Sequence, residues 1–375
     1  MKNIAVIFGG ESCEHDISII TGVQLLSRAN LPDYNLIPIY IDKNGRWLTG
    51  DELFDLDNFN DEFFAVKECT ITPSSQTLYS IKKRKLKPIT NIDAAILCLH
   101  GGSGEGGGVS GLLSMAKIPY SACSLTSSAM CLDKVAFKYM MKGIGVETID
   151  GFAIFEEEYI LGKQGVEDKV NKMGYPVILK PSKLGSSIGI EVVNEKGELE
   201  EKLKKCFVFD KKVLIEKYVN IKKEINIAVI ENKGDLIFSN TEEPISKSAI
   251  LSFDEKYGNN TDGFEGIKRI SPALINEEMT QVIRDTAAKI YSKLDLFGVV
   301  RFDFILDIGD QLYINEVNTI PGSMANYLFD KDEYPYNKLI DIMVSNAIHR
   351  KVKEGQYQAN YISDVLNKGI KVLEK

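Results

Sequence analysis

The N-terminal third of the chain alternates continuous apolar runs with one amphipathic stretch. KNIAVIF (2–8), NLIPIYID (35–42) and AAILCLH (94–100) have the length of buried strands, whereas ISIITGVQLLSRA (17–29) repeats its apolar positions as a helix does. Strands that alternate with helices predict a parallel sheet, which binds ligands at the carboxyl ends of its strands. Residues 50–90 are charged and lack a clear period, so we expect an irregular insertion there.

The pattern changes from about residue 123 onward. DKVAFKYMMKG (133–143) has the pattern of a helix, and YPVILKPSKLGSSIGIEVV (175–193) has that of a strand, a glycine loop and a second strand. The tail, 350–375, is expected to be a polar loop followed by an amphipathic helix. An α/β (α+β) chain of this kind predicts three domains, which cover residues 1–122, 123–215 and 216–375.

A hairpin is predicted at VRFDFILDIGDQLYINEVNTIPG (300–322), where two short runs flank the turn-forming DIGD. A symmetric turn places Arg301 opposite Glu316 and Asp303 opposite Ile314. Side chains alternate along a strand, so one face of the hairpin is expected to carry four polar residues at one end and three apolar residues nearer the turn. The polar residues are Arg301, Asp303, Glu316 and Asn318, and the apolar residues are Ile305, Leu312 and Ile314.

This mixed face is more typical of the wall of a cleft than of a solvated surface, which is the alternative. Carboxylate and amide oxygens suit a hard cation such as Mg²⁺, which proteins hold with a few carboxylates and the phosphates of a substrate. Glu316 is placed to bridge two ions, with Asp303 on one side and Asn318 on the other. The hairpin therefore raises the question of whether the chain also binds a nucleotide.

The composition of the chain limits the classes of molecule that it is expected to bind. The chain has 375 residues, 44% of them hydrophobic, which is enough for two or three domains with their own cores. Its net charge of −8 and pI near 5.2 argue against nucleic acid or an anionic membrane as a partner. An anionic substrate such as ATP therefore needs a local group of Lys and Arg side chains.

Six scattered cysteines without a CxxC pair indicate neither a zinc site nor a disulfide framework, and three histidines make a histidine-based metal site improbable. We expect reduced thiols in a cytoplasmic protein. The apolar run at the N-terminus is too short for a signal peptide, and no stretch of the sequence is long enough to span a membrane.

Two glycine-rich loops are candidates for binding phosphate. HGGSGEGGG (100–108) formally matches GxGxxG, but it follows the third strand and no acidic strand end comes about 20 residues later, so a dehydrogenase is a weak alternative. ILKPSKLGSSIGI (178–190) joins a strand-end lysine to small residues whose N–H groups can close over a phosphate. An ordinary glycine hairpin is the alternative, and a Walker A loop is absent from the sequence.

Taken in order, these segments resemble the ATP-grasp ligases and, among them, the D-alanine–D-alanine ligase family. The resemblance covers nearly the whole chain except residues 50–90 and the tail. It implies an N-terminal parallel-sheet domain and two α+β domains that hold ATP between them. Its marks are FGGESCEHDIS (8–18), LHGGSGEGGGVSGLL (99–113), LDK (132–134), GYPVILKPSKLGSSIGI (174–190), LIEKYV (214–219), DEKY (254–257), RFDF (301–304) and NEVNTIPG (315–322).

The resemblance implies roles for single residues. Two Mg²⁺ ions, or Mn²⁺ as the alternative, would bind Asp303, Glu316 and Asn318. The ATP phosphates would meet Lys134, Lys180 and Ser187, the adenine would face Glu216, Lys217 and Val219, and the ribose would face Glu224. Arg301 would meet the acyl-phosphate and the tetrahedral intermediate, and Glu14 the amino group of the first D-alanine. Ser186 and Tyr257 would complete a triad with Glu14. Lys256 would cover the phosphate from a lid at 252–269. The remaining substrate-binding residues would be His100, Gly322 and Tyr327.

The implied reaction is the ATP-dependent joining of two D-alanines into D-alanyl-D-alanine for peptidoglycan, through an acyl-phosphate and with release of ADP and phosphate. A homodimer is also implied. The chain departs from the family pattern where SMANY follows NTIPG, which puts Asn326 and Tyr327 at a usual His and Ser. The alternatives are therefore the same mechanism with D-serine, D-lactate or another amino acid as second substrate, and an ATP-binding protein without turnover.

Overall fold

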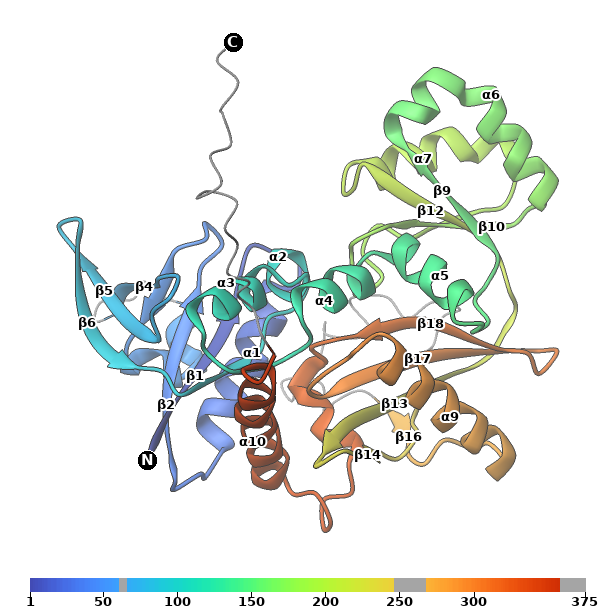
Figure 1. Cartoon of the computed structure of the whole chain (residues 1–375). Coiled ribbons are helices and arrows are strands. Elements are labelled where there is room, and N and C mark those ends of the chain that lie inside the picture. The colour runs from blue at the N-terminus through green and yellow to red at the C-terminus, as the bar shows by residue number, and fades with distance from the viewer. Residues whose placement is uncertain (61–65, 246–267, 358–375) are drawn as a thin grey trace, which may run out of the picture.

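The structure is a computed structural model that describes residues 1–60, 66–245 and 268–357. Its largest sheet has the strand order β6-β5-β4-β3-β2-β1-β7-β8 (Figure 1). The four neighbours β2, β1, β7 and β8 are parallel, as the alternation of strands and helices predicted. These strands are β2 (Tyr34–Ile41), β1 (Lys2–Gly9), β7 (Ala94–Leu97) and β8 (Tyr120–Ser121), and the helices between them are α1 (His15–Arg28), α2 (Gly102–Glu105) and α3 (Gly108–Ala116).

The expectation of an irregular insertion at 50–90 was wrong. This segment extends the sheet with antiparallel strands on the far side of β2. Cys69, Ile71 and Leu78 are buried, and these few apolar positions hold the extension to the sheet without making a run that periodicity detects. The elements are β3 (Trp47–Thr49), the 3₁₀ turns η1 (Asp51–Phe54) and η2 (Leu56–Asn60), β4 (Lys67–Ile71), β5 (Thr77–Lys82) and β6 (Lys85–Asn91).

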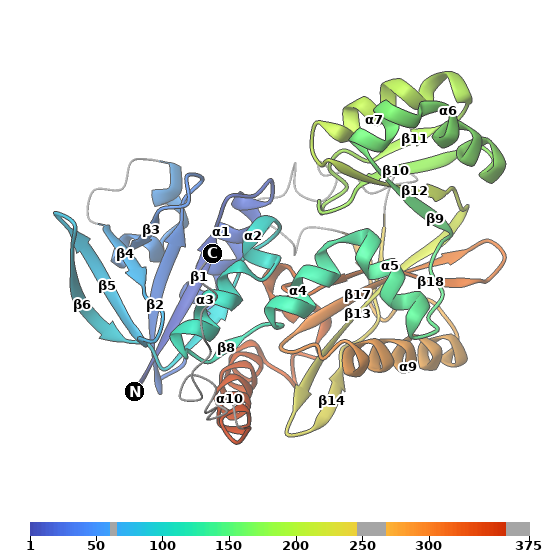
Figure 2. The ribbon, with the colours of Figure 1, turned by 45° about the horizontal axis from the view of Figure 1, so that its top comes forward.

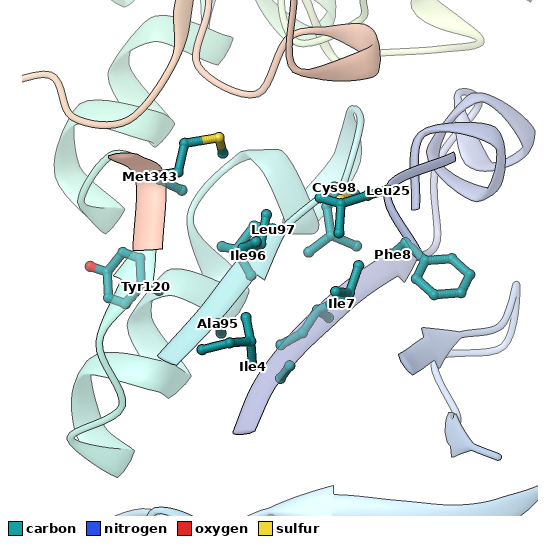
Figure 3. Close-up of a cluster of buried hydrophobic side chains, with 14 of the residues drawn as sticks. Ile4, Ile7, Phe8, Leu25, Ala95, Ile96, Leu97, Cys98, Tyr120 and Met343 are labelled. Carbon is teal, nitrogen blue, oxygen red and sulfur yellow. The ribbon is translucent and has the colours of Figure 1, made fainter. Parts of the chain in front are cut away.

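The C-terminal helix α10 (Tyr336–Glu354) packs against the N-terminal sheet, next to β7 and β8. Met343 lies near Tyr120 in the core that Ile96 and Leu97 help to form (Figure 3). The prediction of a polar loop from residue 350 was wrong for 350–354, because the Arg350 guanidinium stacks 3.8 Å from the Phe297 ring and holds the last turn of the helix. The rest of the predicted tail, from 358, lies outside the described residues.

The central sheet is antiparallel and has the order β11-β10-β12-β9. Helices α6 and α7 cover its outer face, which points away from the rest of the molecule (Figures 1 and 2). Its other face is therefore turned toward the C-terminal part of the chain. The elements are β9 (Gly151–Phe155), α6 (Glu156–Met173), β10 (Val177–Pro181), β11 (Glu191–Val193), η3 (Lys196–Glu198), α7 (Leu199–Phe207) and β12 (Lys212–Lys217).

The third sheet is antiparallel and has the order β14-β13-β17-β18. Phe137 and Met141 of α5 share one buried core with Ile225 and Phe302 of this sheet, although the sequence assigned that helix to the central domain. The three domain boundaries stay predictions. The elements are α4 (Leu125–Leu132), α5 (Lys134–Gly143), β13 (Ile221–Asn232), β14 (Asp235–Phe238), β15 (Glu243–Pro244), β16 (Arg269–Ile270), α9 (Glu277–Lys293), β17 (Val300–Asp307), β18 (Leu312–Asn318) and the 3₁₀ segment η5 (Gly322–Leu328).

The hairpin of β17 and β18 has a different register from the predicted one. Arg301 lies opposite Asn318 and Asp303 opposite Glu316, because a β-bulge follows Asp303 and leaves Asn315 as an extra residue in β18. The four polar residues do share one face, as predicted.

The apolar half of the hairpin prediction was wrong in part for the same reason. The bulge turns Ile314 toward Phe304, where both side chains are buried in the C-terminal core, and Leu312 packs against that core. Ile305 alone of the three predicted apolar residues lines the hollow described below. A symmetric turn does not reproduce this switch, because one extra residue reverses the face of every side chain beyond it.

The six cysteines are free, and five of them are buried, as expected for core thiols. Burial raises the pKa of the Cys69 thiol to about 12, which keeps it protonated and unreactive. In the described part of the chain, no helix combines the length and apolar character needed to cross a membrane.

Candidate active site

Two hollows meet between the three sheets. The larger one lies between the central and C-terminal sheets, and the smaller one lies next to the ends of β7 and α1 in the N-terminal domain. Both hollows are lined by the same five residues at the point where they join, so a molecule in one can touch a molecule in the other. These residues are Lys134, Leu184, Gly185, Arg301 and Glu316.

The larger hollow combines apolar walls with cations. Ile149, Ile178 and Val219 form part of its lining, and the side chains of Lys134 and Lys180 lie in it as well. An apolar slot that ends in lysines suits a molecule with a flat base and an anionic tail. Ser187, Glu224 and Tyr327, to which the resemblance gave roles in the nucleotide and substrate sites, also line this hollow.

Lys134 is held at the start of α5 by the residue before it. Asp133 caps the helix by accepting hydrogen bonds from the N–H groups of Val135 and Ala136, each at 3.1 Å. The Lys134 ammonium donates to the carbonyl of Leu184 and lies 3.8 Å from Glu316 Oε2. The LDK motif therefore folds into a capped helix start that directs one lysine to the junction of the two hollows.

Lys180 projects from the end of β10 and is held by two acceptors. Its Nζ lies 2.5 Å from Glu216 Oε2 and donates to Asn315 Oδ1 at 3.2 Å. Burial acts to raise the pKa of the Glu216 carboxyl, but the Lys180 and Lys138 ammonium groups outweigh it and keep that pKa below its usual range. Glu216 is therefore a buried anion that orders lysines.

The adenine contacts predicted at LIEKYV are spread over different surfaces. Val219 lines the larger hollow, whereas the Glu216 carboxylate is bound between two lysines. The Lys217 side chain lies at a separate hollow beside Asp150 and Asp307. The roles of Glu216 and Lys217 toward adenine stay predictions.

The glycine loop between β10 and β11 connects the two hollows. Ser186 and Ser187 both have left-handed backbone, with φ of 52° and 59°, which bends the loop sharply over the junction. The Ser186 hydroxyl donates to Glu14 Oε1. A Cβ on Gly185 would lie 2.7 Å from Glu14 Oε2, so a larger residue here would displace this carboxylate.

Glu14 and Ser186 are two of the three members of the predicted triad, and they are hydrogen bonded to each other. Its third member, Tyr257, and the lid residue Lys256 lie outside the described residues, as does most of the predicted lid. Their roles stay predictions. Glu14 precedes α1, and this position brings a residue from the N-terminal domain to a loop of the central domain.

The polar end of the hairpin forms a compact ion-pair network. The Arg301 guanidinium donates to both carboxylate oxygens of Asp303 at 2.7 Å, and Asn318 Nδ2 donates to Asp303 Oδ2 at 3.0 Å. Burial acts to lower the pKa of Arg301, but Asp303 outweighs this and raises it above its ordinary value. Arg301 is therefore a permanent cation at the junction.

The donor set fits a magnesium site. Among the described residues, no group of three His, Cys, Asp or Glu gathers in one place. The protein oxygens near the junction come from Asp303, Glu316 and Asn318, two carboxylates and an amide on paired strands. Mg²⁺ is commonly held by one or two carboxylates together with substrate phosphates, so these residues match what it needs when a nucleotide is bound.

The smaller hollow is lined by buried groups that suit an amino acid. Glu14, Ser186 and Gly322 line it, as do His100 and Glu105. His100 Nε2 is 2.9 Å from the Thr21 hydroxyl, and burial lowers the pKa of the imidazole to about 4, which makes it neutral. His100 is therefore an uncharged part of the wall of this hollow, held by Thr21 and the backbone of Ile320.

Glu105 was missed by the sequence reasoning, although it lies within the predicted glycine loop. Its Oε2 accepts a hydrogen bond from the N–H of Gly101 at 2.8 Å. Burial first, and then the charge of Glu14, raise the pKa of the Glu105 carboxyl to about 8. The single acidic letter in a run of glycines was the available signal, and only the fold shows that it enters the substrate hollow.

Asn315 and Lys138 were also missed. Asn315 becomes part of the site because of the bulge, which a sequence pattern does not show. Lys138 follows Lys134 by four residues, so the two share one face of α5, and that spacing was a readable signal.

Tyr327 separates two arginines in the larger hollow. The Arg301 Nη1 group donates to its hydroxyl at 3.3 Å, and the Arg269 guanidinium carbon lies 4.1 Å from the centre of its ring. The residue that departs from the family pattern is thus in contact with Arg301, at the point where the two hollows join.

Comparisons with known proteins agree on one family. The family models described as D-ala D-ala ligase N-terminus and D-ala D-ala ligase C-terminus match residues 3–123 and 140–345. The curated D-alanine–D-alanine ligase of Thermosipho melanesiensis is 38% identical over 356 residues, which cover 93% of this chain and 94% of that protein.

Solved structures share the fold. The D-alanine-D-alanine ligase from Coxiella burnetii has a TM-score of 0.80 at 23% identity and covers 95% of this chain and 96% of its own. The VanG D-Ala:D-Ser ligase from Enterococcus faecalis has a TM-score of 0.77 at 25% identity, with 92% and 99% coverage. The match to both chains over nearly their full length includes all three sheets.

Proposed function

The chain belongs to the D-alanine–D-alanine ligase family, and on that premise we propose how its residues join two D-alanines in a reaction driven by ATP. It is an ATP-dependent ligase with the ATP-grasp fold. The observation that carries the proposal is the junction of the two hollows at Lys134, Arg301 and Glu316. Phosphoryl transfer from a nucleotide to an amino acid needs two sites that meet at a group of cations.

ATP would occupy the larger hollow. Its base would lie against the apolar wall that includes Val219, its ribose near Glu224, and its phosphates near Lys134, Lys180 and the Ser187 loop. The two lysines supply local positive charge for an anionic ligand, although the net charge of the chain is negative. When bound, Mg²⁺ held by Asp303, Glu316 and Asn318 would offset the charge that develops on the transferred phosphoryl group.

The first D-alanine would occupy the smaller hollow. Its ammonium would pair with Glu14, which Ser186 holds in place, and its carboxylate would point toward the junction. A carboxylate is a poor electrophile, so its oxygen must first attack the γ-phosphorus of ATP and displace ADP. Neutral His100 at the same hollow lets the zwitterion bind without a competing cation.

The second D-alanine would then attack the acyl carbon with its amine, and phosphate would leave. The negative charge on the tetrahedral oxygen is stabilised by Arg301, which lines both hollows and keeps its proton at every physiological pH. The Tyr327 hydroxyl accepts a hydrogen bond from this guanidinium, so we place Tyr327 next to the second substrate. A closed site keeps water away from the acyl-phosphate.

D-Alanine is the second substrate in this proposal, because the curated relative at 38% identity is named a D-alanine–D-alanine ligase. D-Serine and D-lactate are the alternatives that Tyr327 leaves for the test. The homodimer and the cytoplasmic location inferred from the resemblance also stay predictions.

Phosphate release and product mass test this assignment together. Purified protein is incubated with Mg-ATP and D-alanine alone, and in parallel with D-alanine plus D-serine or D-lactate. We expect phosphate release with D-alanine alone and the mass of D-alanyl-D-alanine. If phosphate is released only when D-serine or D-lactate is added, that molecule is the second substrate. If ATP binds but no mixture releases phosphate, the proposed ligase activity is wrong.

A further inference from the structure

A buried lysine that no predicted role includes lies behind the nucleotide site. Lys138 follows Lys134 by one turn of α5, and its side chain is 15% exposed. Burial lowers the pKa of its ammonium group, although Glu216 acts to raise it. A charged group in such a position needs a reason, because a buried lysine costs stability unless it is well paired.

The contacts of Lys138 lead directly to the nucleotide-binding lysine. Its Nζ lies 2.5 Å from Glu216 Oε1 and donates to the carbonyl of Ile149. The other oxygen of Glu216 lies 2.5 Å from Lys180 Nζ, and Lys180 also donates to Asn315 Oδ1 at 3.2 Å. One carboxylate is therefore divided between two lysines, one oxygen to each.

This division affects how strongly Lys180 is held. The Glu216 side chain is 4% exposed, so its charge is poorly screened by water and must be balanced by neighbouring cations. With both lysines present, the group carries a net positive charge and Lys180 is free to share its hydrogens with another anion. Without Lys138, the charge of Glu216 would be balanced by Lys180 alone. Glu216 would then compete with the ATP phosphates for the Lys180 ammonium.

The same contacts also link two parts of the molecule. Lys138 belongs to a helix that packs in the C-terminal core, whereas Glu216 and Lys180 are on neighbouring strands of the central sheet. The nucleotide hollow lies between these two parts. The ion pair therefore fixes Lys180 relative to both walls of the hollow.

We propose that Lys138 is a positioning residue for ATP, which holds Glu216 so that the Lys180 ammonium stays directed at the nucleotide phosphates. The proposal rests on the proposed function in placing ATP in the larger hollow. Lys138 itself does not touch the nucleotide in this account. Its effect passes through Glu216, and that route distinguishes it from a lysine that only stabilises the fold.

The test compares the affinity for a non-hydrolysable ATP analogue, measured by calorimetry with Mg²⁺, in four proteins. Lys138→Met is expected to weaken binding by about 10-fold or more and to raise the KM for ATP, with the KM for D-alanine changed less than about 2-fold. Lys138→Arg should restore most of the affinity, because it replaces the cation. Lys142→Met, one turn further along α5 at an exposed position, is the matched control and should bind as the wild type does.

A double-mutant cycle tests the route through Glu216, and Lys138→Gln replaces Lys138→Met throughout if the latter folds poorly. In a Glu216→Gln background the buried anion is gone, so adding Lys138→Met should change the nucleotide affinity less than 2-fold. An equal loss of affinity in both backgrounds, or a lower melting temperature with unchanged affinity, would overturn the proposal. Wild-type ligation is measured in parallel, so nucleotide binding without ligation would contradict the proposed function while the cycle still decides the role of Lys138.

Discussion

Glu316 is the carboxylate that lies where the two hollows join. It lines both hollows, lies opposite Asp303 on the paired strand and has one carboxylate oxygen 3.8 Å from the Lys134 ammonium. Its side chain is 27% exposed, so its charge is not part of the buried core. A group in this position can bind a cation without being needed for folding.

Glu316→Gln should therefore lower kcat by roughly 100-fold or more, a loss typical of removing one group that stabilises transition-state charge. The amide keeps the size of the side chain but removes its negative charge, which Mg²⁺ requires. The melting temperature should stay within about 2 °C of the wild type, because the amide has the size of the carboxylate and the side chain is partly exposed. Near-normal turnover by this variant would contradict the metal site proposed on the hairpin.

Glu105 makes a prediction about pH. Its pKa is raised to about 8 in the folded chain, so the folded protein keeps a proton that the unfolded protein releases above pH 4.5. The free energy of unfolding should therefore contain a contribution that is present below pH 4.5 and is lost as the pH rises to 8, on the order of a few kcal/mol. Glu105→Gln removes this titration while keeping the acceptor for Gly101.

Urea unfolding of both proteins at several pH values between 4.5 and 8 measures this difference. The stability of the wild type should fall relative to Glu105→Gln as the pH rises. Parallel curves over this range would show that Glu105 titrates normally.

At the scale of elements, the start of α5 places Lys134 at the junction. The Asp133 side chain accepts two backbone hydrogen bonds of the helix, accepts another from the Ser182 hydroxyl at 2.8 Å and pairs with Lys212. Burial acts to raise the pKa of Asp133, but the Lys212 ion pair and these hydrogen bonds outweigh it and keep the pKa below its ordinary value. One carboxylate thus fixes the helix to two strands of the central sheet.

Asp133→Ala is expected to reduce the free energy of unfolding by about 1–3 kcal/mol, since it removes a helix cap and leaves buried donors unpaired. It should also raise the KM for ATP several-fold, because the helix start that positions Lys134 is no longer held in place. Asn276→Ala, which removes the cap of α9, is the control. It should cost similar stability without changing the KM, and an equal change of KM in both variants would contradict the role of this helix start.

The elements also show how far sequence reasoning reaches. The parallel strands β1, β2 and β7, the helices α1 and α5, and the strand–loop–strand at 175–193 were predictable, because each has a long apolar run or clear period. The bulge at Asn315 was not, since a single extra residue leaves the composition of both strands unchanged. The site residues that carry a motif could be named in advance, whereas Lys138 and Glu105 gain their partners only from packing between distant elements.

At the scale of the whole molecule, the C-terminal helix packs against the N-terminal sheet. Helix α10 comes after the site hairpin, yet its buried residues Leu339, Ile340 and Met343 pack in the core of the N-terminal sheet. No local pattern predicts which sheet a C-terminal helix will cover, and the sequence division at residue 216 did not anticipate it. The N-terminal sheet is thereby joined to the C-terminal part of the chain through α10.

Leu339→Ala tests this arrangement. Leu339 is fully buried, so the substitution should leave a cavity and reduce the free energy of unfolding by about 2–5 kcal/mol. Because the contact lies between the N-terminal sheet and the last helix, limited proteolysis should release the C-terminal segment faster than in the wild type. Val352→Ala, at an exposed position on the same helix, should leave both properties unchanged.

Isotope transfer measures directly whether the γ-phosphoryl group of ATP in the larger hollow passes to the carboxylate of D-alanine in the smaller one and forms an acyl-phosphate. D-Alanine labelled with ¹⁸O in its carboxylate is incubated with unlabelled Mg-ATP in ordinary water, and the inorganic phosphate is analysed by mass spectrometry. In our account one carboxylate oxygen forms the bond to phosphorus and leaves with the phosphate, so each phosphate should carry one ¹⁸O. Phosphate without ¹⁸O, formed while the dipeptide accumulates, would contradict the mechanism.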